Sequence, residues 1–132
     1  MSLINRNTDY ATRAICFMAK KHNQRLSVDD LVRHLKIPRP FLRKILQILN
    51  KKGILKSYKG KGGGFLLKQS PEKIFLIDLI NIFQGRLKIK ECFLGDKICP
   101  KVRSCPLGHK LKDIEDYVIR QLKSLNVASL LS

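Results

Sequence analysis

Acidic residues are scarce in this chain, which has 10 Asp and Glu against 27 Lys and Arg among its 132 residues. None occurs from Leu31 to Pro71, although Lys and Arg are frequent there. The formal net charge of +17 makes the polar surface repel itself, so a polyanion is the expected partner. A merely solvated basic face is the alternative, and it does not explain the structural pattern that the same stretch contains.

Long apolar runs are also missing. No run of about 18 apolar residues occurs, which argues against a membrane span. The first residues lack the basic-then-apolar layout of a signal peptide, so we expect a cytoplasmic protein. No paired carboxylates or Ser/His/Asp set stand out, and we predict that the chain is not an enzyme. Its length and 44% hydrophobic content fit one compact domain with an appended element.

Three of the four cysteines lie close together. Cys92, Cys99 and Cys105 fall with His109 into one short segment. In a reducing cytosol such a cluster favours metal or redox chemistry over structural disulfides. The fourth, Cys16, stands among apolar residues and is predicted to be a small buried core residue.

Helical patterns occupy the first fifty residues. Apolar residues at helical spacing predict a helix over residues 9–22. Ser27 is the expected N-cap of a second helix, and Pro38 and Pro40 begin a third that Gly53 stops. The apolar stripe of the third helix consists of Phe41, Leu42, Ile45, Leu46 and Leu49. Two helices joined by a tight turn, the second beginning with basic residues, are typical of a helix-turn-helix.

Two short β-prone segments follow, over residues 54–67. They flank a loop with glycines at positions 60, 62, 63 and 64, which can take left-handed conformations. A nucleotide phosphate loop is the alternative, but the Gly-Lys-Ser/Thr ending and the following helix are missing. The pattern therefore predicts a winged helix-turn-helix with a two-stranded β-wing, in a fold that is mainly α (α+β).

The C-terminal part predicts two more helices. The first covers residues 76–83 and ends at Gly85. The last carries a stripe of apolar residues that is longer than one small domain covers, which indicates a contact with a second subunit; packing on its own domain is the alternative. We expect a DNA-binding domain over residues 1–85, a cysteine-rich loop over 86–106 and a dimerisation helix with its tail over 107–132. The stripe consists of Leu107, Leu111, Ile114, Val118, Leu122 and Leu125.

Residues that contact DNA are predicted on the third helix and the wing. Arg43 or Lys44 is placed to reach a guanine edge in the major groove. Lys59 and Lys61 at the wing tip would lie against phosphates or in a minor groove. The predicted interface comprises Arg39, Pro40, Arg43, Lys44, Lys59, Gly60, Lys61 and Gly62, with Lys51, Lys52 and Lys56 on phosphates.

Four stretches and the cysteine loop together resemble the Rrf2-type family of bacterial winged-helix regulators. The stretches are residues 9–14, 37–46, 53–57 and 59–67. The resemblance covers essentially the whole chain. It implies a homodimer that presents two recognition helices and two wings to a pseudo-palindromic operator in double-stranded DNA. It also implies that an iron–sulfur cluster at the cysteine loop tunes DNA affinity.

The donor set agrees with that implication. Iron–sulfur clusters need thiolate ligands, which Cys92, Cys99 and Cys105 would supply. Zinc, a thiol switch and a site without metal are alternatives, although the cysteine spacing lacks the paired knuckle of structural zinc sites. For the fourth ligand, His109 stands one residue later than in family members with a histidine and would go with a two-iron cluster. Asp9 matches a carboxylate that nitric-oxide-sensing members supply from the other subunit, and would go with a four-iron cluster.

The expected function is a transcription regulator, a repressor, that senses iron or cluster status, nitric oxide or redox stress. A cluster-free or zinc-binding regulator that responds to thiols or small molecules is the alternative. A small electron-transfer protein would have no use for a recognition helix and a glycine-rich wing.

Overall fold

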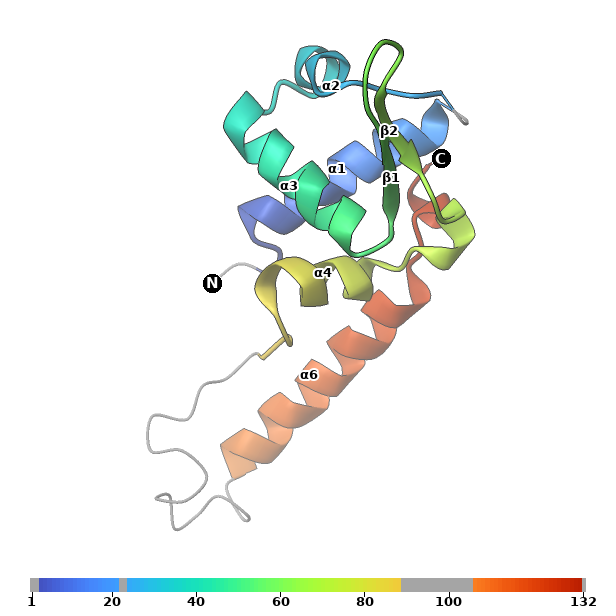
Figure 1. Ribbon diagram of the computed structural model, residues 1–132. Helices are drawn as coiled ribbons and strands as arrows, with labels where there is room; N and C mark the ends of the chain where they lie inside the picture. Colours follow the sequence, from blue (N-terminus) through green and yellow to red (C-terminus); the bar gives the residue numbers. More distant parts are fainter. Residues whose placement is uncertain (1–2, 22–23, 89–105, 132) are drawn as a thin grey trace.

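The computed structural model describes residues 3–21, 24–88 and 106–131, which are mainly helical. Three helices and a β-hairpin form one end of the molecule, and a long helix runs away from it at the other (Figure 1). The elements are α1 (Arg6–Lys20), α2 (Val28–Leu35), α3 (Arg39–Lys51), β1 (Leu55–Tyr58), β2 (Gly64–Leu67), the 3-10 turn η1 (Pro71–Lys73), α4 (Leu76–Gln84), α6 (Pro106–Ser124) and the 3-10 turn η2 (Ala128–Leu130).

The helix-turn-helix consists of α2, a short turn and α3. Lys36 ends α2 in the left-handed region, with φ of 57°, and its backbone N–H donates to the Val32 carbonyl at 2.9 Å. Pro38 caps α3, and Pro40 lies in its first turn, where a missing N–H costs nothing. Because the chain reverses within three residues, the start of α3 lies close to α2.

The wing is an antiparallel pair in which Leu55 faces Leu67 and Tyr58 faces Gly64. A third segment joins it, because Leu26 forms a β-bridge with Phe65. Gly64 makes this close approach possible, since its φ is 141° and a Cβ there would lie 2.6 Å from the Leu26 carbonyl oxygen. The wing is therefore anchored to the chain just before α2.

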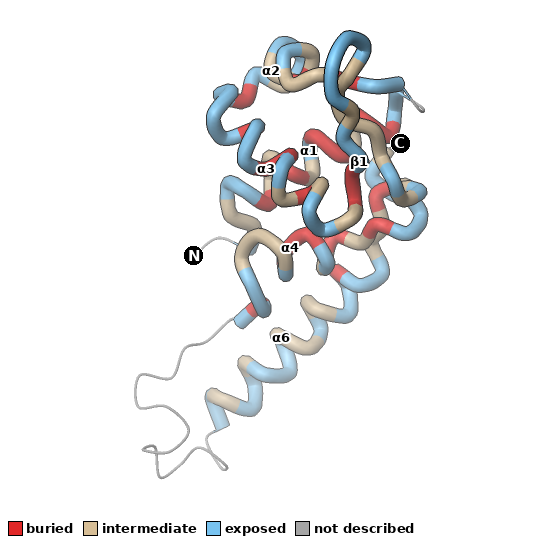
Figure 2. The backbone as a smooth tube through the Cα atoms, in the orientation of Figure 1, coloured by how far each residue is buried: buried red, intermediate tan, exposed pale blue. Residues whose placement is uncertain are grey.

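The main core surrounds α1, which packs against α3 and α4. Figure 2 shows buried backbone concentrated where α1, α3 and β1 meet. Polar contacts also join the start of α1 to the end of α4: Thr8 Oγ1 donates to Gln84 Oε1 at 2.7 Å, and the Asn5 N–H donates to the same oxygen at 3.0 Å. The fully buried side chains of this core include Ala11, Ala14, Ile15, Leu31, Leu42, Leu46, Leu49 and Leu79.

A smaller apolar cluster joins α4 to the C-terminal end of α6 through Leu76, Ile80, Leu87 and Leu122. Backbone hydrogen bonds from Leu76 to Leu125 and from Val127 to Ile74 fix that end of α6. The other end of α6 extends away from the winged helix (Figure 1). No helix within the described ranges is long and apolar enough to cross a membrane.

The structure matches the predicted fold class of a mainly helical winged helix-turn-helix. Three details differ. α1 begins at Arg6 rather than residue 9, because Asn5 caps it by accepting from the Thr8 N–H at 2.9 Å. Phe41, predicted to belong to the apolar stripe of α3, is 43% exposed, since the buried face is already complete without it. Leu125 lies just past the end of α6.

Candidate nucleic-acid interface

One side of α3 is buried and the other carries positive charge. Leu42, Ile45, Leu46 and Leu49 face the core and leave the remaining residues on the surface. The exposed residues include four that the sequence predicts at DNA: Arg39, Pro40, Arg43 and Lys44. Among the described residues, Arg43 and Lys44 have no ion-pair partner, so both are available to an anion. No acidic residue lies in the first turn of α3.

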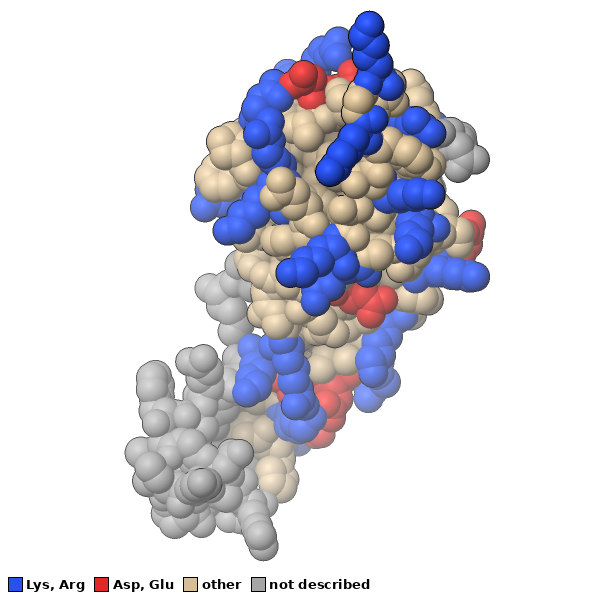
Figure 3. Space-filling model, viewed as in Figure 1, with Lys and Arg blue, Asp and Glu red and all other residues tan. Residues whose placement is uncertain are grey.

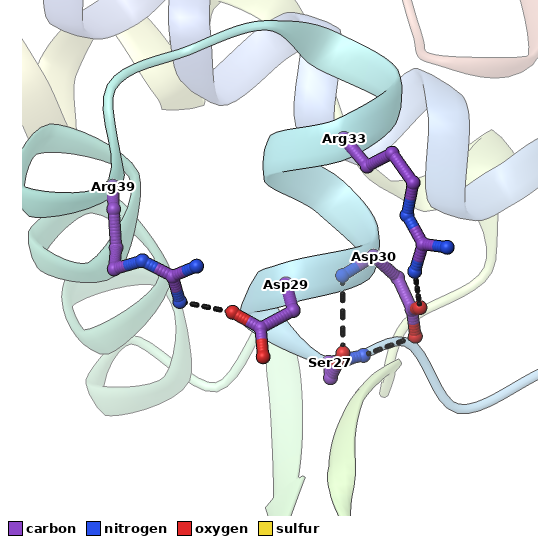
Figure 4. A network of polar contacts seen from close by, with 5 residues as sticks. All are labelled: Ser27, Asp29, Asp30, Arg33 and Arg39. Atoms are coloured by element: carbon purple, nitrogen blue, oxygen red, sulfur yellow. Dashed lines mark hydrogen bonds and ion pairs between the residues drawn. The ribbon is translucent and has the colours of Figure 1, made fainter.

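The start of α2 is held by a capping box (Figure 4). The Asp30 N–H donates to Ser27 Oγ at 3.1 Å, and the Ser27 N–H donates to the Asp30 carboxylate at 3.0 Å. These hydrogen bonds with the backbone and side chain of Ser27 hold the pKa of Asp30 below its ordinary value. Arg33 donates to the other carboxylate oxygen at 2.8 Å. The cap fixes the first residue of α2. Because only a short turn follows α2, the position of α2 also sets the position at which α3 begins.

Arg39 does not point freely into solvent. Its guanidinium pairs with the Asp29 carboxylate in the first turn of α2 (Figure 4). Both side chains are largely exposed, so the pair is worth little in stability. The ion pair places a carboxylate against Arg39, one of the predicted DNA contacts. To contact DNA, Arg39 must leave Asp29 and bind a phosphate or a base instead.

The wing tip consists of Lys59, Gly60, Lys61 and Gly62, all exposed. Gly60 and Gly62 have φ of 83° and 72°, a region that costs other residues free energy. A Cβ at Gly63 would overlap the Tyr58 carbonyl oxygen, which explains why the tip needs glycine there too. The backbone therefore turns tightly and carries the two lysines outward.

The predicted phosphate contacts Lys51, Lys52 and Lys56 are exposed as well. Lys51 ends α3, Lys52 is its C-cap, and Lys56 lies in β1. Figure 3 shows Lys and Arg side chains spread over the face that α2, α3 and the wing share, with few acidic ones among them. The fold thus brings α3 and the wing, the two parts of the chain that carry the predicted cations, to one side of the molecule (Figure 1).

Two cations beside this face lie outside the acid-free stretch, and composition alone gave no signal for them. Arg6, in the first turn of α1, lies over the exposed ring of Phe41 with its Cζ 5.2 Å from the ring centroid. Arg25, just before α2, lies over Tyr58 at 3.7 Å. Both are far in sequence from the aromatic residue that they contact, so only the fold reveals them.

The proposed cluster ligands Cys92, Cys99 and Cys105 lie outside the described residues. Within the described ranges no group of three or more His, Cys, Asp or Glu is arranged to hold a metal ion. His109 is exposed in the first turn of α6. Asp9 is in α1, and its carboxylate pairs with Arg13 at 3.0 Å. The two candidates for a fourth ligand therefore come from separate helices.

A pocket of about 490 Å³ lies beside Asp9. Arg6, Arg13 and Lys36 also line it, so positive charge surrounds the single carboxylate. This pocket joins the start of α1 to the turn between α2 and α3. Its lining thus includes both the Asp9 carboxylate and residues of the turn that precedes α3.

Cys16 and His34 play smaller parts. Cys16 is half-buried against the core rather than fully buried as predicted, because it lies at the edge of the buried face of α1; burial raises the pKa of its thiol. His34 is exposed near the end of α2 and stacks on Phe17 with ring centroids 5.0 Å apart.

Known proteins are similar to this chain in sequence and in fold. Residues 4–132 match the sequence model of the Rrf2 family, described as iron-dependent transcriptional regulators. The regulator NsrR of Bacillus licheniformis is 31% identical over 106 residues, which are 79% of this chain and 74% of NsrR.

Solved structures give the same fold. CymR, the global cysteine regulator of Bacillus subtilis, superposes with a TM-score of 0.80 at 23% identity, over 99% of this chain and 97% of CymR. IscR of T. potens gives 0.75 at 21% identity, over 97% of this chain and 85% of IscR. The family and these relatives are transcription regulators rather than enzymes, as the sequence predicts. The chain belongs to the Rrf2 family of helix-turn-helix transcriptional regulators.

Proposed function

We propose that this chain is a cytoplasmic repressor that binds a pseudo-palindromic operator as a homodimer. An iron–sulfur cluster held by its cysteine segment sets its affinity for the operator. The observation that carries the DNA-binding part is the cationic face of α3 and the wing, in which Arg43, Lys44, Lys59 and Lys61 are all exposed and without an ion pair among the described residues.

The arrangement of α3 and the wing supports binding to a duplex. The basic N-terminal turns of α3 can enter the major groove, where an arginine or lysine recognises guanine, while the wing lies over the neighbouring backbone. Lys51, Lys52 and Lys56 then stand where phosphates flank the groove. Contacts to phosphate position the protein, and contacts to base edges give sequence preference.

The homodimer is supported by α6. Leu107, Ile114 and Tyr117 on this helix are 60%, 51% and 57% exposed. Apolar side chains in such a row along one helix are typical of a helix that packs against another. A second copy of α6 would cover them and would hold two recognition helices at a fixed spacing, as a palindromic site requires.

The cluster is supported by the chemistry of its donors. Cys92, Cys99 and Cys105 supply soft thiolates, which iron–sulfur clusters require, and among the described residues His109 and Asp9 offer the fourth ligand. A bound cluster would supply a group whose integrity depends on iron supply, nitric oxide or oxidants.

As the fourth ligand, Asp9 would be supplied by the other protomer, as the resemblance to nitric-oxide-sensing members implies. Cys105 directly precedes Pro106 in the chain, and Pro106 begins α6 at the end that points away from α1 (Figure 1). Asp9 would also have to leave Arg13, whereas His109 already lies in the first turn of α6. The cluster would thus either stay within one protomer or bridge the dimer.

The cluster is tested by anaerobic purification with optical and electron paramagnetic resonance spectra, followed by footprinting of the holo and apo forms on an operator selected from random duplexes. We expect a coloured protein and a footprint that changes with cluster loss. Cys92→Ala, Cys99→Ala and Cys105→Ala should abolish the colour, whereas Cys16→Ala, the matched control, should keep it. A colourless protein whose footprint is unchanged by the first three substitutions refutes the cluster, and bound zinc would favour the zinc alternative.

The fourth ligand is tested with Asp9→Ala and His109→Ala. If only one of these two substitutions alters the spectrum of the cluster, the residue that it replaces is the fourth ligand.

The DNA contacts are tested by a second pair of variants. Arg43→Ala should cost about 1–3 kcal/mol on the operator and little on random DNA, because a base contact is lost. Lys52→Ala should weaken binding to both alike and lower the salt slope by about one unit, because only a phosphate contact is lost. Equal losses on operator and random DNA for Arg43→Ala would remove it from base recognition.

A further inference from the structure

The segment before α2 is part of the wing sheet. The Leu26 N–H donates to the Phe65 carbonyl at 3.0 Å, and the Phe65 N–H donates back to the Leu26 carbonyl at 2.8 Å. This reciprocal pair sits beside Gly64, whose missing side chain allows the approach. Arg25, the residue before Leu26, is thereby held at a fixed place beside the hairpin although more than thirty residues separate them in sequence.

The alternation of side chains then decides which way Arg25 faces. Leu26 points into the core and is only 4% exposed, so its neighbour Arg25 points to the outer face of the sheet. Lys56 and Tyr58 in β1 share that outer face. The Cζ atom of Arg25 lies 3.7 Å from the centroid of the Tyr58 ring, and Lys56 Nζ lies 5.3 Å from it. One aromatic ring therefore holds two cations.

This arrangement leaves the donors of Arg25 available. Stacking on a ring uses the flat face of the guanidinium, whereas its N–H groups lie in the plane and can still bind a phosphate with two parallel hydrogen bonds. Neither Arg25 nor Lys56 has a carboxylate partner among the described residues. Two like charges against one ring also repel each other, and a shared anion relieves that repulsion.

We propose that Arg25 and Tyr58 join Lys56 in a phosphate-binding surface, the outer wing patch, which binds the DNA backbone beside the wing tip. Arg25 binds the phosphate, Lys56 adds charge, and Tyr58 is the positioning residue that orients both. The patch lies next to the tip, because Tyr58 directly precedes Lys59. The proposal rests on the proposed function, in which the wing contacts DNA, and adds a residue from outside the helix-turn-helix and hairpin.

The test measures binding of the full chain to a labelled random-sequence duplex of about 30 base pairs over a range of salt concentrations. Arg25→Ala should weaken binding several-fold and lower the slope of log affinity against log salt by about one unit, because one phosphate contact is lost. Arg25→Lys should keep the slope but lose part of the affinity, since lysine lacks the two-pronged donor. Lys123→Ala, which removes an exposed cation from the end of α6, is the control and should change little.

Tyr58 is tested in the same assay. Tyr58→Leu should weaken binding although it removes no charge, and Tyr58→Phe should restore it because the ring is kept. Thermal unfolding of each variant separates loss of fold from loss of contact, since a purely structural role moves the melting temperature and leaves the salt slope unchanged.

The outcomes separate this inference from the proposed function. If Lys59→Ala and Lys61→Ala lower the salt slope but Arg25→Ala does not, the outer wing patch is overturned and the wing tip still binds DNA. If none of these three substitutions changes DNA binding, the wing does not contact DNA. The outer wing patch is then overturned, and so is the wing contact in the proposed function. A patch that binds an acidic peptide but gives no DNA effect likewise overturns the inference.

Discussion

The winged helix and α6 differ in how far their apolar residues are buried. In the winged helix, the inner faces of α1 and α3 are covered by their own chain, and side chains such as Ile15 and Leu46 have no exposed surface. In α6, Leu122 is the one buried residue, and the helix becomes more exposed toward its N-terminal end (Figure 2).

This difference indicates two kinds of stability. Each fully buried leucine contributes about 1.5–3 kcal/mol through burial, so the winged helix has a core of its own. The exposed apolar residues of α6 gain nothing until another surface covers them. We therefore expect the fold of the winged helix to be independent of protein concentration and the role of α6 to depend on it.

The largest effect is expected from a truncation in the core. Leu46→Ala should lower the free energy of unfolding by about 2–5 kcal/mol, because it leaves a cavity in the main core. Urea unfolding measures this loss. Leu107→Ala removes the same atoms from α6 and, at concentrations where the chain is monomeric, should cost less than about 0.5 kcal/mol. If the two substitutions cost the same, α6 is covered within its own protomer, and the contrast between α6 and the winged helix is wrong.

A charge in the exposed stripe of α6 should have the next largest effect. Ile114→Glu should convert the dimer into monomers while the circular dichroism of the winged helix stays unchanged, because a buried unpaired carboxylate opposes association. Sedimentation over a range of concentrations measures the shift. Lys123→Glu places the same residue at an exposed position on the opposite face of α6 and serves as control. A dimer that survives Ile114→Glu would assign the interface to another surface.

The smallest effect concerns the capping box of α2. The folded-state pKa of Asp30 is lowered, so its contribution to stability is present above the ordinary value of 3.8 and is lost as the pH falls through the lowered pKa. Asp30→Asn should cost about 1 kcal/mol at neutral pH, and the difference from the unsubstituted chain should shrink in acid. Urea unfolding at several pH values measures it, with Asp113→Asn on α6 as control. A difference that is the same at every pH would contradict the capping role.

The order of elements was predictable because local signals mark it. Ser27, Pro38 and Pro40 delimit the helix-turn-helix, and the glycines of the wing require a tight turn at one place. Phe41 was misassigned because helical spacing cannot tell the edge of a buried face from its centre. The stacking of Arg25 on Tyr58 and the pairing of Arg39 with Asp29 were not predictable, because both depend on how separate segments meet in space.

The hydrogen bonds of Gln84 also have a mechanical consequence. Gln84 is the last residue of α4, and its side-chain oxygen is bonded to both Asn5 and Thr8 at the start of α1. A displacement of the end of α4 would therefore act on the opening turn of α1 through these hydrogen bonds. That turn carries Arg6, which rests on Phe41 of the recognition helix. The end of α4 is therefore connected to α3 through the Gln84 hydrogen bonds and the Arg6–Phe41 contact.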